Sequence, residues 1–351
     1  VEEAKRVAQS IGYPVIIKAS AGGGGRGMRV VYKHEDLEAA HKAATHEALT
    51  AFNDDSVFIE KYVENPRHIE VQIVADNQGN VIHLGERECS IQRKQQKLIE
   101  EAPSSALSPK KREEITAAAV RLAKEANYSS LGTVEFLLDY KGDFFFMEMN
   151  TRIQVEHPIT EEITQLDLVE LQLNIANNKP LPITQKEVKF QGWAIECRIN
   201  AEDIQNNFTP STGVIKAIRV PEGNHIRIES GVKVGSEITT FFDSMIMKLI
   251  VHGKNRKDAI KKTEKALNEL YIKGIKTTIP FHKAVLTHDD FIDGDFNTSF
   301  VQEYADELDF TEDNEDVAAA VYVLAHYYDS YYKPPQINPT TDYWSLNNKL
   351  K

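Results

Sequence analysis

The residues with the clearest chemical potential lie at positions 147–158, a run that combines two acids, an amide, an arginine and a glutamine. The apolar residues 144–147 that open it predict a buried β-strand. Because side chains alternate between the two faces of a strand, Glu148 and Asn150 are expected on the same face. Carboxylate and amide oxygens are typical ligands of Mg²⁺, which proteins usually bind with one or two carboxylates plus nucleotide phosphates. The run therefore predicts a magnesium site with a second acid on a neighbouring strand.

Glu135 fits this second acid because it interrupts the apolar strand predicted at residues 132–138. Charged side chains are seldom buried unless they are paired or bound to a metal. A single acid of this kind is more often an edge or ion-paired carboxylate. Two such acids followed by Asn150 and Arg152 favour the metal site instead.

A second candidate is the glycine-rich segment at residues 22–27. It matches GxGxxG, but a dinucleotide fingerprint needs a helix after the glycines, and a strand is predicted there at residues 28–32. Met28-Arg29 stands where a Walker A motif needs lysine and serine or threonine, so that motif is excluded as well. Glycines between two strands predict a mobile hairpin whose bare backbone N–H groups can approach phosphate oxygens. A plain flexible loop is the alternative. Lys18, at the end of the strand leading in, favours phosphate binding because it places a point charge there.

The segment at residues 89–97 is cationic within an acidic chain. Alone, it indicates a solvated basic strand. Arg152, Gln154 and Arg198 change this interpretation, because a pocket for a small oxyanion needs planar guanidinium groups and converging donors. For Arg198, the alternative is a strand-end arginine paired to Glu196.

Composition limits the function classes. The 351-residue chain is 41% hydrophobic and 27% charged, which suits a globular protein with room for two domains. Its net charge of -12 argues against a nucleic-acid partner. We find no apolar run of transmembrane length and no signal-peptide h-region, so we expect no membrane association and a cytoplasmic location. Cys89 and Cys197 lack the spacing of a zinc site or disulfide framework, and we expect two buried thiols.

Periodicity and turn residues predict the order of elements. Helices are predicted at residues 1–9, 36–49, 108–127, 167–176 and 256–269, the third with Ser108 as N-cap and Pro109 at its first position. Strands are predicted at residues 13–19, 28–32, 57–62, 68–75, 81–86, 132–138, 144–150, 191–200, 214–220, 226–230 and 245–252. The run Pro180-Leu181-Pro182 marks a domain boundary.

Together these motifs resemble the biotin carboxylase component of biotin-dependent carboxylases, an ATP-grasp family. The matching runs span roughly residues 1–300 and lie at residues 15–27, 60–68, 92–103, 148–158, 196–203 and 242–245. The resemblance implies an α+β fold, with an ATP-grasp domain at residues 1–180 that comprises a lid at about residues 1–62 and a central antiparallel sheet. It implies a biotin carboxylase C-terminal domain at residues 190–300, followed by an acidic and aromatic tail at residues 301–351.

The resemblance also implies the roles of individual residues. ATP is held by Lys18, Gly24, Gly25 and His68, with Glu60, Lys61, Tyr62 and Val63 around the adenine and with Gln92 and Gln95. Two Mg²⁺ or Mn²⁺ ions are held by Glu135, Glu148 and Asn150, and bicarbonate by Lys97, Arg152, Gln154 and Val155. Glu156 corresponds to the family's base and Arg198 to its biotin-site arginine. Gln95 stands where many members have histidine, and its amide can still bond a ribose hydroxyl or phosphate.

The implied function is ATP-dependent carboxylation of biotin by bicarbonate through carboxyphosphate, the first half-reaction of an acetyl-CoA, propionyl-CoA or pyruvate carboxylase. The expected partners are a biotin carboxyl carrier protein, a carboxyltransferase and a second copy of the chain. Fatty acid biosynthesis is one expected setting. The resemblance further implies that the family's N-terminal domain is missing before Val1, so we expect this chain alone to be inactive or impaired. The alternatives are an ATP-grasp ligase of the carbamoyl-phosphate-synthetase type and an inactive fragment that retains only partner binding.

Overall fold

The computed structural model describes residues 1–21, 27–305, 307–308 and 321–328. The chain forms two compact units, Val1–Phe310 and Thr311–Lys351. In the second unit, residues 321–328 are helical and expose the large side chains of Val321 to Leu324. The expected glycines Gly24 and Gly25, and most of the predicted tail, lie outside the described residues. None of the described helices is long and apolar enough to cross a membrane.

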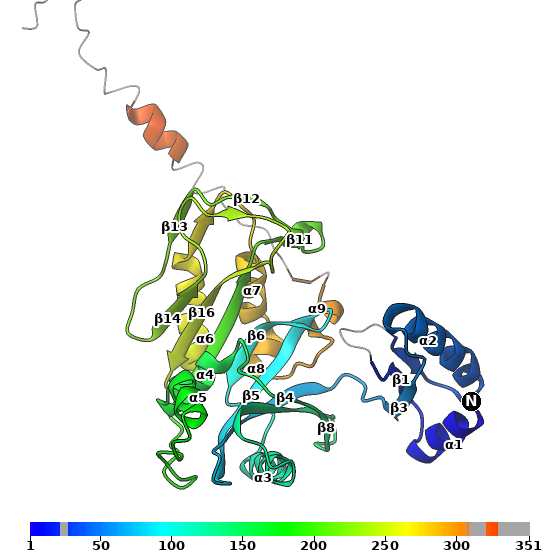
Figure 1. Cartoon of the computed structure of the whole chain (residues 1–351). Coiled ribbons are helices and arrows are strands. Elements are labelled where there is room, and N and C mark those ends of the chain that lie inside the picture. Colours follow the sequence, from blue (N-terminus) through cyan, green and yellow to red (C-terminus); the bar gives the residue numbers. More distant parts are fainter. Residues whose placement is uncertain (22–26, 306, 309–320, 329–351) are drawn as a thin grey trace, which may run out of the picture. The chain divides into compact units, whose positions relative to one another are not determined.

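The N-terminal part of the first unit is a small layered subdomain (Figure 1). Its antiparallel sheet has the order β2-β1-β3 and consists of β1 (Val15–Ala19), β2 (Arg29–Val31) and β3 (Val57–Lys61). Two helices, α1 (Glu2–Ile11) and α2 (Leu37–Phe52), bury their apolar faces on it, with a short 3-10 helix, η1 (His34–Asp36), before α2. Gly27 has a left-handed φ of 71°, and an added Cβ would lie 2.8 Å from the Cβ of Ala19, so glycine is required there.

The centre of the unit is an eight-stranded sheet of order β14-β16-β9-β6-β5-β4-β7-β8, in which every pairing is antiparallel. Its strands are β4 (Arg67–Ala75), β5 (Val81–Arg93), β6 (Gln96–Ala102), β7 (Ser130–Leu138), β8 (Phe144–Asn150), β9 (Trp193–Asn200), β14 (Ile226–Ser230) and β16 (Met245–Gly253). The predicted central antiparallel sheet is therefore confirmed.

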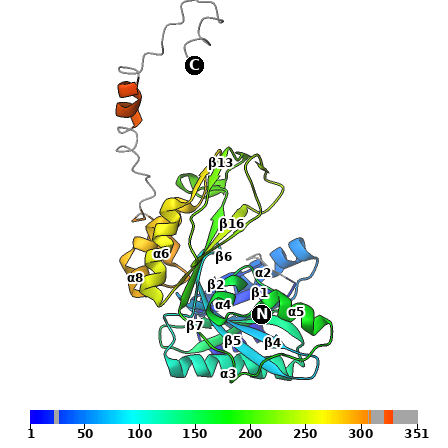
Figure 2. The ribbon, with the colours of Figure 1, turned by 90° about the vertical axis from the view of Figure 1, so that its left-hand side faces the viewer.

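Helices cover the two faces of this sheet. Helix α3 (Pro109–Glu125) runs along β4 and β5 (Figure 2), where its Ile115, Ala119 and Ala123 join a core with alternate residues of β4 and β7. Ser108 caps α3 as predicted, accepting a hydrogen bond from the Lys111 backbone N–H. The opposite face packs against α4 (His157–Thr164) and α5 (Leu168–Ala176). On β4, His68, Glu70 and Gln72 alternate with the residues that face α3, so they lie on the opposite face of the sheet.

The C-terminal part of the first unit contains the largest apolar cluster. It is built around α6 (Arg256–Glu269), α7 (Ile279–Thr287), α8 (Asp289–Asp293) and α9 (Phe300–Glu303). Short pairs of strands border it: β10 (Glu202–Asp203) with β11 (Thr209–Pro210), β12 (Gly213–Val214) with β15 (Glu237–Ile238), and β13 (Ala217–Arg219) with β17 (Tyr271–Lys273). A second 3-10 helix, η2 (Ile204–Asn206), follows β10.

Several elements differ from the sequence predictions. Strand β8 is an edge strand rather than a buried one, and Phe146 is 52% exposed on it. The cationic segment forms a long β5–β6 hairpin that the sequence did not indicate, because Lys94 and Gln95 occupy its turn with φ of 48° and 66°. Asparagine or glycine is the usual signal for such a turn. Helices α4, α7, α8 and α9 were also not predicted.

The sheet continues across the predicted domain boundary, because β6 pairs directly with β9. Residues 1–180 and 190–300 thus contribute strands to one sheet within one compact unit. The division of the chain at residues 180–190 stays a prediction.

Candidate active site

A row of charged side chains crosses four neighbouring strands of the large sheet. Arg87 of β5 is paired with Glu70 of β4, and Glu70 is paired in turn with Glu135 of β7. Glu148 of β8 completes the row opposite Glu135. Arg87 and Glu70 are fully buried, Glu135 is 4% exposed, and Glu148 is exposed. Acids that face each other across strands repel, so three adjacent carboxylates need positive charge between them.

Lys97 of β6 supplies positive charge at the buried end of the row. Its Nζ lies 2.5 Å from Glu70 Oε2 and 3.3 Å from Glu135 Oε1. Burial disfavours the ionised form of Glu70, but Arg87 and Lys97 outweigh burial and lower the pKa of Glu70 to about 2. Burial also opposes ionisation of Glu135, and the hydrogen bond with His68 together with Lys97 lowers the pKa of Glu135 to about 2. Both acids are therefore ionised at neutral pH.

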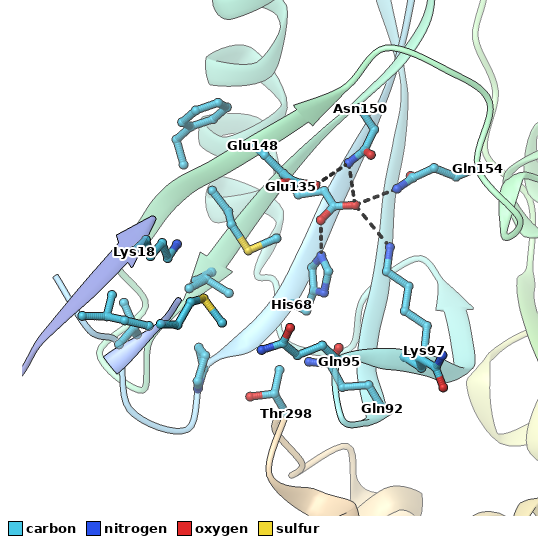
Figure 3. Close-up of a pocket in the computed structure, with 18 of the residues that line it drawn as sticks. Lys18, His68, Gln92, Gln95, Lys97, Glu135, Glu148, Asn150, Gln154 and Thr298 are labelled. Carbon is cyan, nitrogen blue, oxygen red and sulfur yellow. Dashed lines mark hydrogen bonds and ion pairs between the residues drawn. The ribbon is translucent and has the colours of Figure 1, made fainter. Parts of the chain in front are cut away.

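At the exposed end of the row, the Asn150 amide lies between two carboxylates (Figure 3). Its Nδ2 donates to Glu135 Oε1 at 3.1 Å and to Glu148 Oε1 at 3.0 Å. A neutral amide leaves the negative charge of the two acids in place, so this end of the row fits a cation. Two carboxylates, and an amide whose Oδ1 can turn toward a cation bound between them, match the oxygen donors preferred by Mg²⁺. The predicted ligands Glu135, Glu148 and Asn150 thus converge at one point.

Glu156 lies at the N-cap of α4 and is buried. Pro158 falls in the first turn of this helix, where its missing N–H costs nothing. The two carboxylate oxygens of Glu156 each accept from a cation: Oε1 from Lys97 Nζ at 2.5 Å and Oε2 from Arg198 Nη2 at 3.0 Å. Glu156 therefore bridges the charged row to β9.

Arg198 of β9 also donates its Nε to Glu100 Oε1 at 2.5 Å. The alternative pairing of Arg198 with Glu196 is wrong. Glu196 is fully buried, and neither of its carboxylate oxygens has a hydrogen-bond partner among the described residues. Burial and the facing Glu100 raise the pKa of Glu196 well above its usual value, and burial raises the pKa of Glu100 to about 7 against the pull of Arg198.

Four more predicted residues lie near the charged row. Gln154 accepts from Arg87 Nη2 at 3.0 Å and donates its own Nε2 to Glu135 at 2.6 Å. The Val155 carbonyl accepts from Lys248 at 2.9 Å. Arg152 is exposed and donates to the Ile153 carbonyl at 3.2 Å. The His68 ring lies 3.0 Å from Glu135, so it contacts a predicted metal ligand as well as the space where ATP is expected.

On the N-terminal subdomain, Lys18 of β1 forms an ion pair with Glu60 of β3. A phosphate group would have to compete with Glu60 for this lysine. Lys61 points its ammonium group toward the carbonyl oxygens of Gly12 and Tyr13, at 2.9 and 3.2 Å. The ammonium group of Lys61 is therefore occupied by backbone carbonyl oxygens of this subdomain.

Many of the side chains described above line one cavity of about 1150 Å³. It is lined by every predicted site residue that the structure describes: Lys18, Glu60, Lys61, Tyr62, Val63, His68, Gln92, Gln95, Lys97, Glu135, Glu148, Asn150, Arg152, Gln154, Val155, Glu156 and Arg198. Figure 3 shows Gln92 and Gln95 of the β5–β6 hairpin below His68, facing Thr298. Residues of the N-terminal subdomain, the large sheet and the C-terminal part of the first unit therefore line one cavity.

Four charged residues that contact this site were not predicted from the sequence. They are all buried: Glu70, Arg87, Glu100 and Lys248. The signal that identified Glu135, a charge within an apolar run, applies equally to Glu70 and Lys248, but Arg87 stands between Glu86 and Glu88, and Glu100 is followed by Glu101. Glu70, between Ile69 and Val71, is the clearest example.

Comparison with known proteins agrees with this geometry. Residues 1–184 match the family model of the carbamoyl-phosphate synthase L chain, ATP binding domain, and residues 196–303 match the biotin carboxylase C-terminal domain. A pyruvate carboxylase subunit of Methanothermobacter thermautotrophicus is 54% identical over 88% of this chain and 62% of its own length. Biotin carboxylase 1 of Bacillus subtilis is 52% identical over 87% of this chain and 68% of its own.

The propionyl-CoA carboxylase alpha chain of Mus musculus is 43% identical over 99% of this chain and 50% of its own length. The chain thus spans between half and about two thirds of these curated relatives. Among solved structures, the biotin carboxylase domain dimer of Hydrogenobacter thermophilus 2-oxoglutarate carboxylase, in complex with MgADP, ADP and bicarbonate, is similar. It has a TM-score of 0.83 and 49% identity, with 89% of this chain and 69% of that chain covered. On the matched domains, the identity and the fold, this chain belongs to the biotin carboxylase family.

Proposed function

We propose that the protein of which this chain is part carboxylates biotin, using ATP and bicarbonate, as the first half-reaction of a biotin-dependent carboxylase. One observation supports the proposal most strongly: a single cavity is lined by three sets of groups. They are the acids Glu135 and Glu148 (the metal-type pair), the donors Lys97, Arg152 and Gln154 (the oxyanion pocket), and Arg198. An ATP-dependent carboxylation needs these three components within reach of one another.

The phosphate end of the proposed reaction lies at the exposed end of the charged row. Glu135, Glu148 and Asn150 would hold Mg²⁺, which supplies charge neutralisation to the ATP phosphates when it is bound. Lys18, released from Glu60, would contact the same phosphates from the lid. Tyr62, Val63, Gln92 and Gln95 line the same cavity and would surround the remainder of the nucleotide.

Bicarbonate would lie between the metal pair and Glu156. Lys97, Arg152 and the Gln154 amide offer donors there, and the Val155 backbone borders the same space. Glu156 would remove the bicarbonate proton, so that the bicarbonate oxygen can attack the γ-phosphate of ATP and yield carboxyphosphate and ADP. The carboxylate of Glu156 is already held in place by Lys97 and Arg198, which keeps its oxygens oriented toward the cavity.

Arg198 would serve the biotin side of the reaction. Carboxyphosphate would release CO₂ together with inorganic phosphate, and this phosphate would take up the ureido N–H proton of biotin. The deprotonated ureido ring carries negative charge on its oxygen, and its nitrogen is then nucleophilic toward CO₂. A guanidinium group fixed by Glu100 and Glu156 is a preorganised stabiliser of such an enolate oxygen. Arg198 remains partly exposed at the cavity wall and is therefore accessible to biotin.

The partners follow from the proposed reaction. Biotin would arrive on a carrier protein, and a carboxyltransferase would use the product. We propose a short acyl-CoA as final acceptor, because the match to the propionyl-CoA carboxylase alpha chain extends over 99% of this chain. We further propose a homodimer as the working assembly and cytoplasm as its compartment.

The rival within the same fold is a ligase of the carbamoyl-phosphate-synthetase type, to which residues 1–184 are similar by family model. That rival would need ammonia as its nucleophile and would have no use for Arg198. The match of residues 196–303 to the biotin carboxylase C-terminal domain supports biotin as acceptor instead.

The test is ATP hydrolysis by a complete enzyme that contains this chain. We expect ADP formation to depend on bicarbonate and labelled bicarbonate to be transferred to free biotin. Glu148→Gln, which removes one negative charge from the metal pair and keeps its shape, should slow both by about 10² or more. Stimulation by ammonia instead of biotin would refute the proposal, and wild-type turnover in Glu148→Gln would refute the metal assignment.

A further inference from the structure

Arg87 is the most completely bonded charged residue that the proposed function does not use. It is fully buried in β5 and is not among the residues that line the cavity. All five of its guanidinium N–H bonds donate to side chains of other elements. Nε donates to Glu70; Nη1 donates to Gln72 at 2.7 Å and Thr160 at 3.0 Å; Nη2 donates to Thr133 at 3.1 Å and Gln154 at 3.0 Å.

The contact with Gln154 fixes the polarity of an amide that faces the cavity. Because Gln154 Oε1 accepts from Arg87, its Nε2 must point the other way, where it donates to Glu135 at 2.6 Å. The opposite orientation would set two N–H₂ groups against each other and an amide oxygen against a carboxylate. Arg87 therefore makes Gln154 a donor at the cavity wall, and an oxyanion requires a donor.

The contact with Glu70 sets the position of a second donor. The two oxygens of Glu70 are divided between Arg87 Nε and Lys97 Nζ. Lys97 in turn reaches Glu156, the proposed base, at 2.5 Å. With Arg87 in place, Glu70 balances one buried guanidinium and needs only part of the charge of Lys97. Without Arg87, the whole charge of Glu70 would draw Lys97 back from the cavity.

We propose that Arg87 is a positioning residue of the oxyanion pocket: it orients the Gln154 amide and the Lys97 ammonium toward the site where bicarbonate is proposed to bind. This inference rests on the proposed function. Arg87 touches neither substrate nor metal and acts through two neighbours that it holds from behind the cavity. Its five acceptors come from β4, β7, α4 and the segment between β8 and α4, so it also ties these elements to one geometry.

The test is steady-state kinetics of Arg87→Lys in the complete enzyme. Lysine keeps the charge but lacks the planar fork, so it cannot serve Glu70 and Gln154 together. We expect the bicarbonate KM to rise about tenfold, the scale of one lost charge-assisted hydrogen bond, with the MgATP KM changed less than about twofold. In a Gln154→Ala background, Arg87→Lys should add much less than it does in the wild type, because the two residues act in series.

Arg112→Lys is the matched control, since Arg112 makes a similar contact with a buried acid away from the cavity. Its Nε donates to Glu86 at 2.7 Å and its Nη2 to the Ser104 carbonyl at 3.1 Å. We expect a smaller fall in melting temperature than for Arg87→Lys, because the Arg112 side chain is 32% exposed, and an unchanged bicarbonate KM. An Arg87→Lys enzyme whose bicarbonate KM is unchanged, or whose two KM values rise equally, would overturn the inference.

A second variant covers the case in which Arg87→Lys does not fold. Thr133→Val combined with Thr160→Val removes two acceptors of Arg87 and alters no charge. The loosened guanidinium should raise the bicarbonate KM about two- to fivefold, and no change would contradict the proposal. Failure of the proposed function itself gives a different result, because the wild-type enzyme would then show no bicarbonate-dependent ADP formation.

Discussion

Arg198 is bonded on one side to Glu156 and on the other to Glu100, and neither contact reaches the metal-type pair. Lys97 still holds the other carboxylate oxygen of Glu156 when Arg198 is removed, so this removal should separate the two stages of the proposed reaction. In Arg198→Ala we expect bicarbonate-dependent ADP formation to survive largely, while carboxylation of biotin falls by about 10² or more, as when one charge-stabilising donor is lost. ADP release and labelled carboxybiotin are measured in the same reaction. An equal loss of both activities would place Arg198 at the phosphates.

Glu100 should leave a signature in the pH dependence of stability. Burial raises its pKa from 4.5 to about 7 in the fold, so between these values the folded protein holds a proton that the unfolded chain has released. This contribution to the free energy of unfolding is present below about pH 4.5 and is lost as the pH rises through about 7. Glu196, Arg198, Glu156 and Lys97 are the charged groups that influence it.

Glu100→Gln removes this titration while keeping an acceptor for Arg198. The decrease in unfolding free energy between pH 5 and pH 8, measured by urea titration, should become shallower by about 2 kcal/mol. Glu125→Gln, at an exposed position near the end of α3, is the control and should leave the slope unchanged. A wild-type slope in Glu100→Gln would mean that Glu100 is ionised throughout this range.

Among the elements, the β5–β6 hairpin has a turn whose residues lower the stability of the fold, although one of them, Gln95, lines the cavity where nucleotide is proposed to bind. Lys94 and Gln95 both have left-handed φ values in its turn, a conformation that costs roughly 1 kcal/mol for such residues. Lys94→Asn should raise the free energy of unfolding by up to about 1 kcal/mol and leave the MgATP KM unchanged. Gln95→Gly should stabilise the turn similarly but weaken MgATP binding, because it removes an amide from the cavity wall.

Thermal melts and nucleotide titration of both variants test this pair. Equal effects of the two substitutions on MgATP binding would show that the turn conformation, rather than the Gln95 side chain, matters for the nucleotide. A loss of stability in Lys94→Asn would show that the Lys94 side chain makes a compensating contact.

The β5–β6 hairpin also shows which features of the site could be predicted from the sequence and which could not. The acids Glu135 and Glu148 were identifiable because a charge in an apolar strand needs a partner. The turn at Lys94 and Gln95 was not, because its residues do not carry the usual turn signal and the pairing of β6 with β9 decides the fold there. Strand β8 looked buried because three phenylalanines in a row normally are, yet Phe145 and Phe146 line a cavity.

Arg87 and Glu70 illustrate a second limit. Glu70 is recognisable as a charge in an apolar run, whereas Arg87 stands between Glu86 and Glu88. Their partnership depends on a register between β4 and β5 that includes a bulge between Val71 and Ile73. A one-residue slip in register would move Glu70 to the other face of the sheet. Which side chains meet across two strands depends on the strand register, and this register is set only when the whole sheet is assembled.

For the whole first unit, the continuous sheet predicts cooperative unfolding across residues 180–190. Trp193 lies on β9, next to the boundary that the sequence suggested, and Trp344 is the second tryptophan of the chain. In a Trp344→Phe background, Trp193 fluorescence and far-UV circular dichroism should give coincident urea transitions. A Trp193 transition well separated from the loss of secondary structure would show that the two sequence ranges unfold independently.

Both cysteines are buried free thiols, as the sequence predicted, and burial raises the pKa of each well above its usual value. Thiols of this kind stay protonated and react slowly with maleimides. This chain therefore provides a background suited to site-specific labelling. Cysteines introduced at Ala43 on α2 and Lys110 on α3, both exposed, could carry a fluorophore pair. Energy transfer between them would report, in real time and without altering the cavity, whether the lid moves when nucleotide binds.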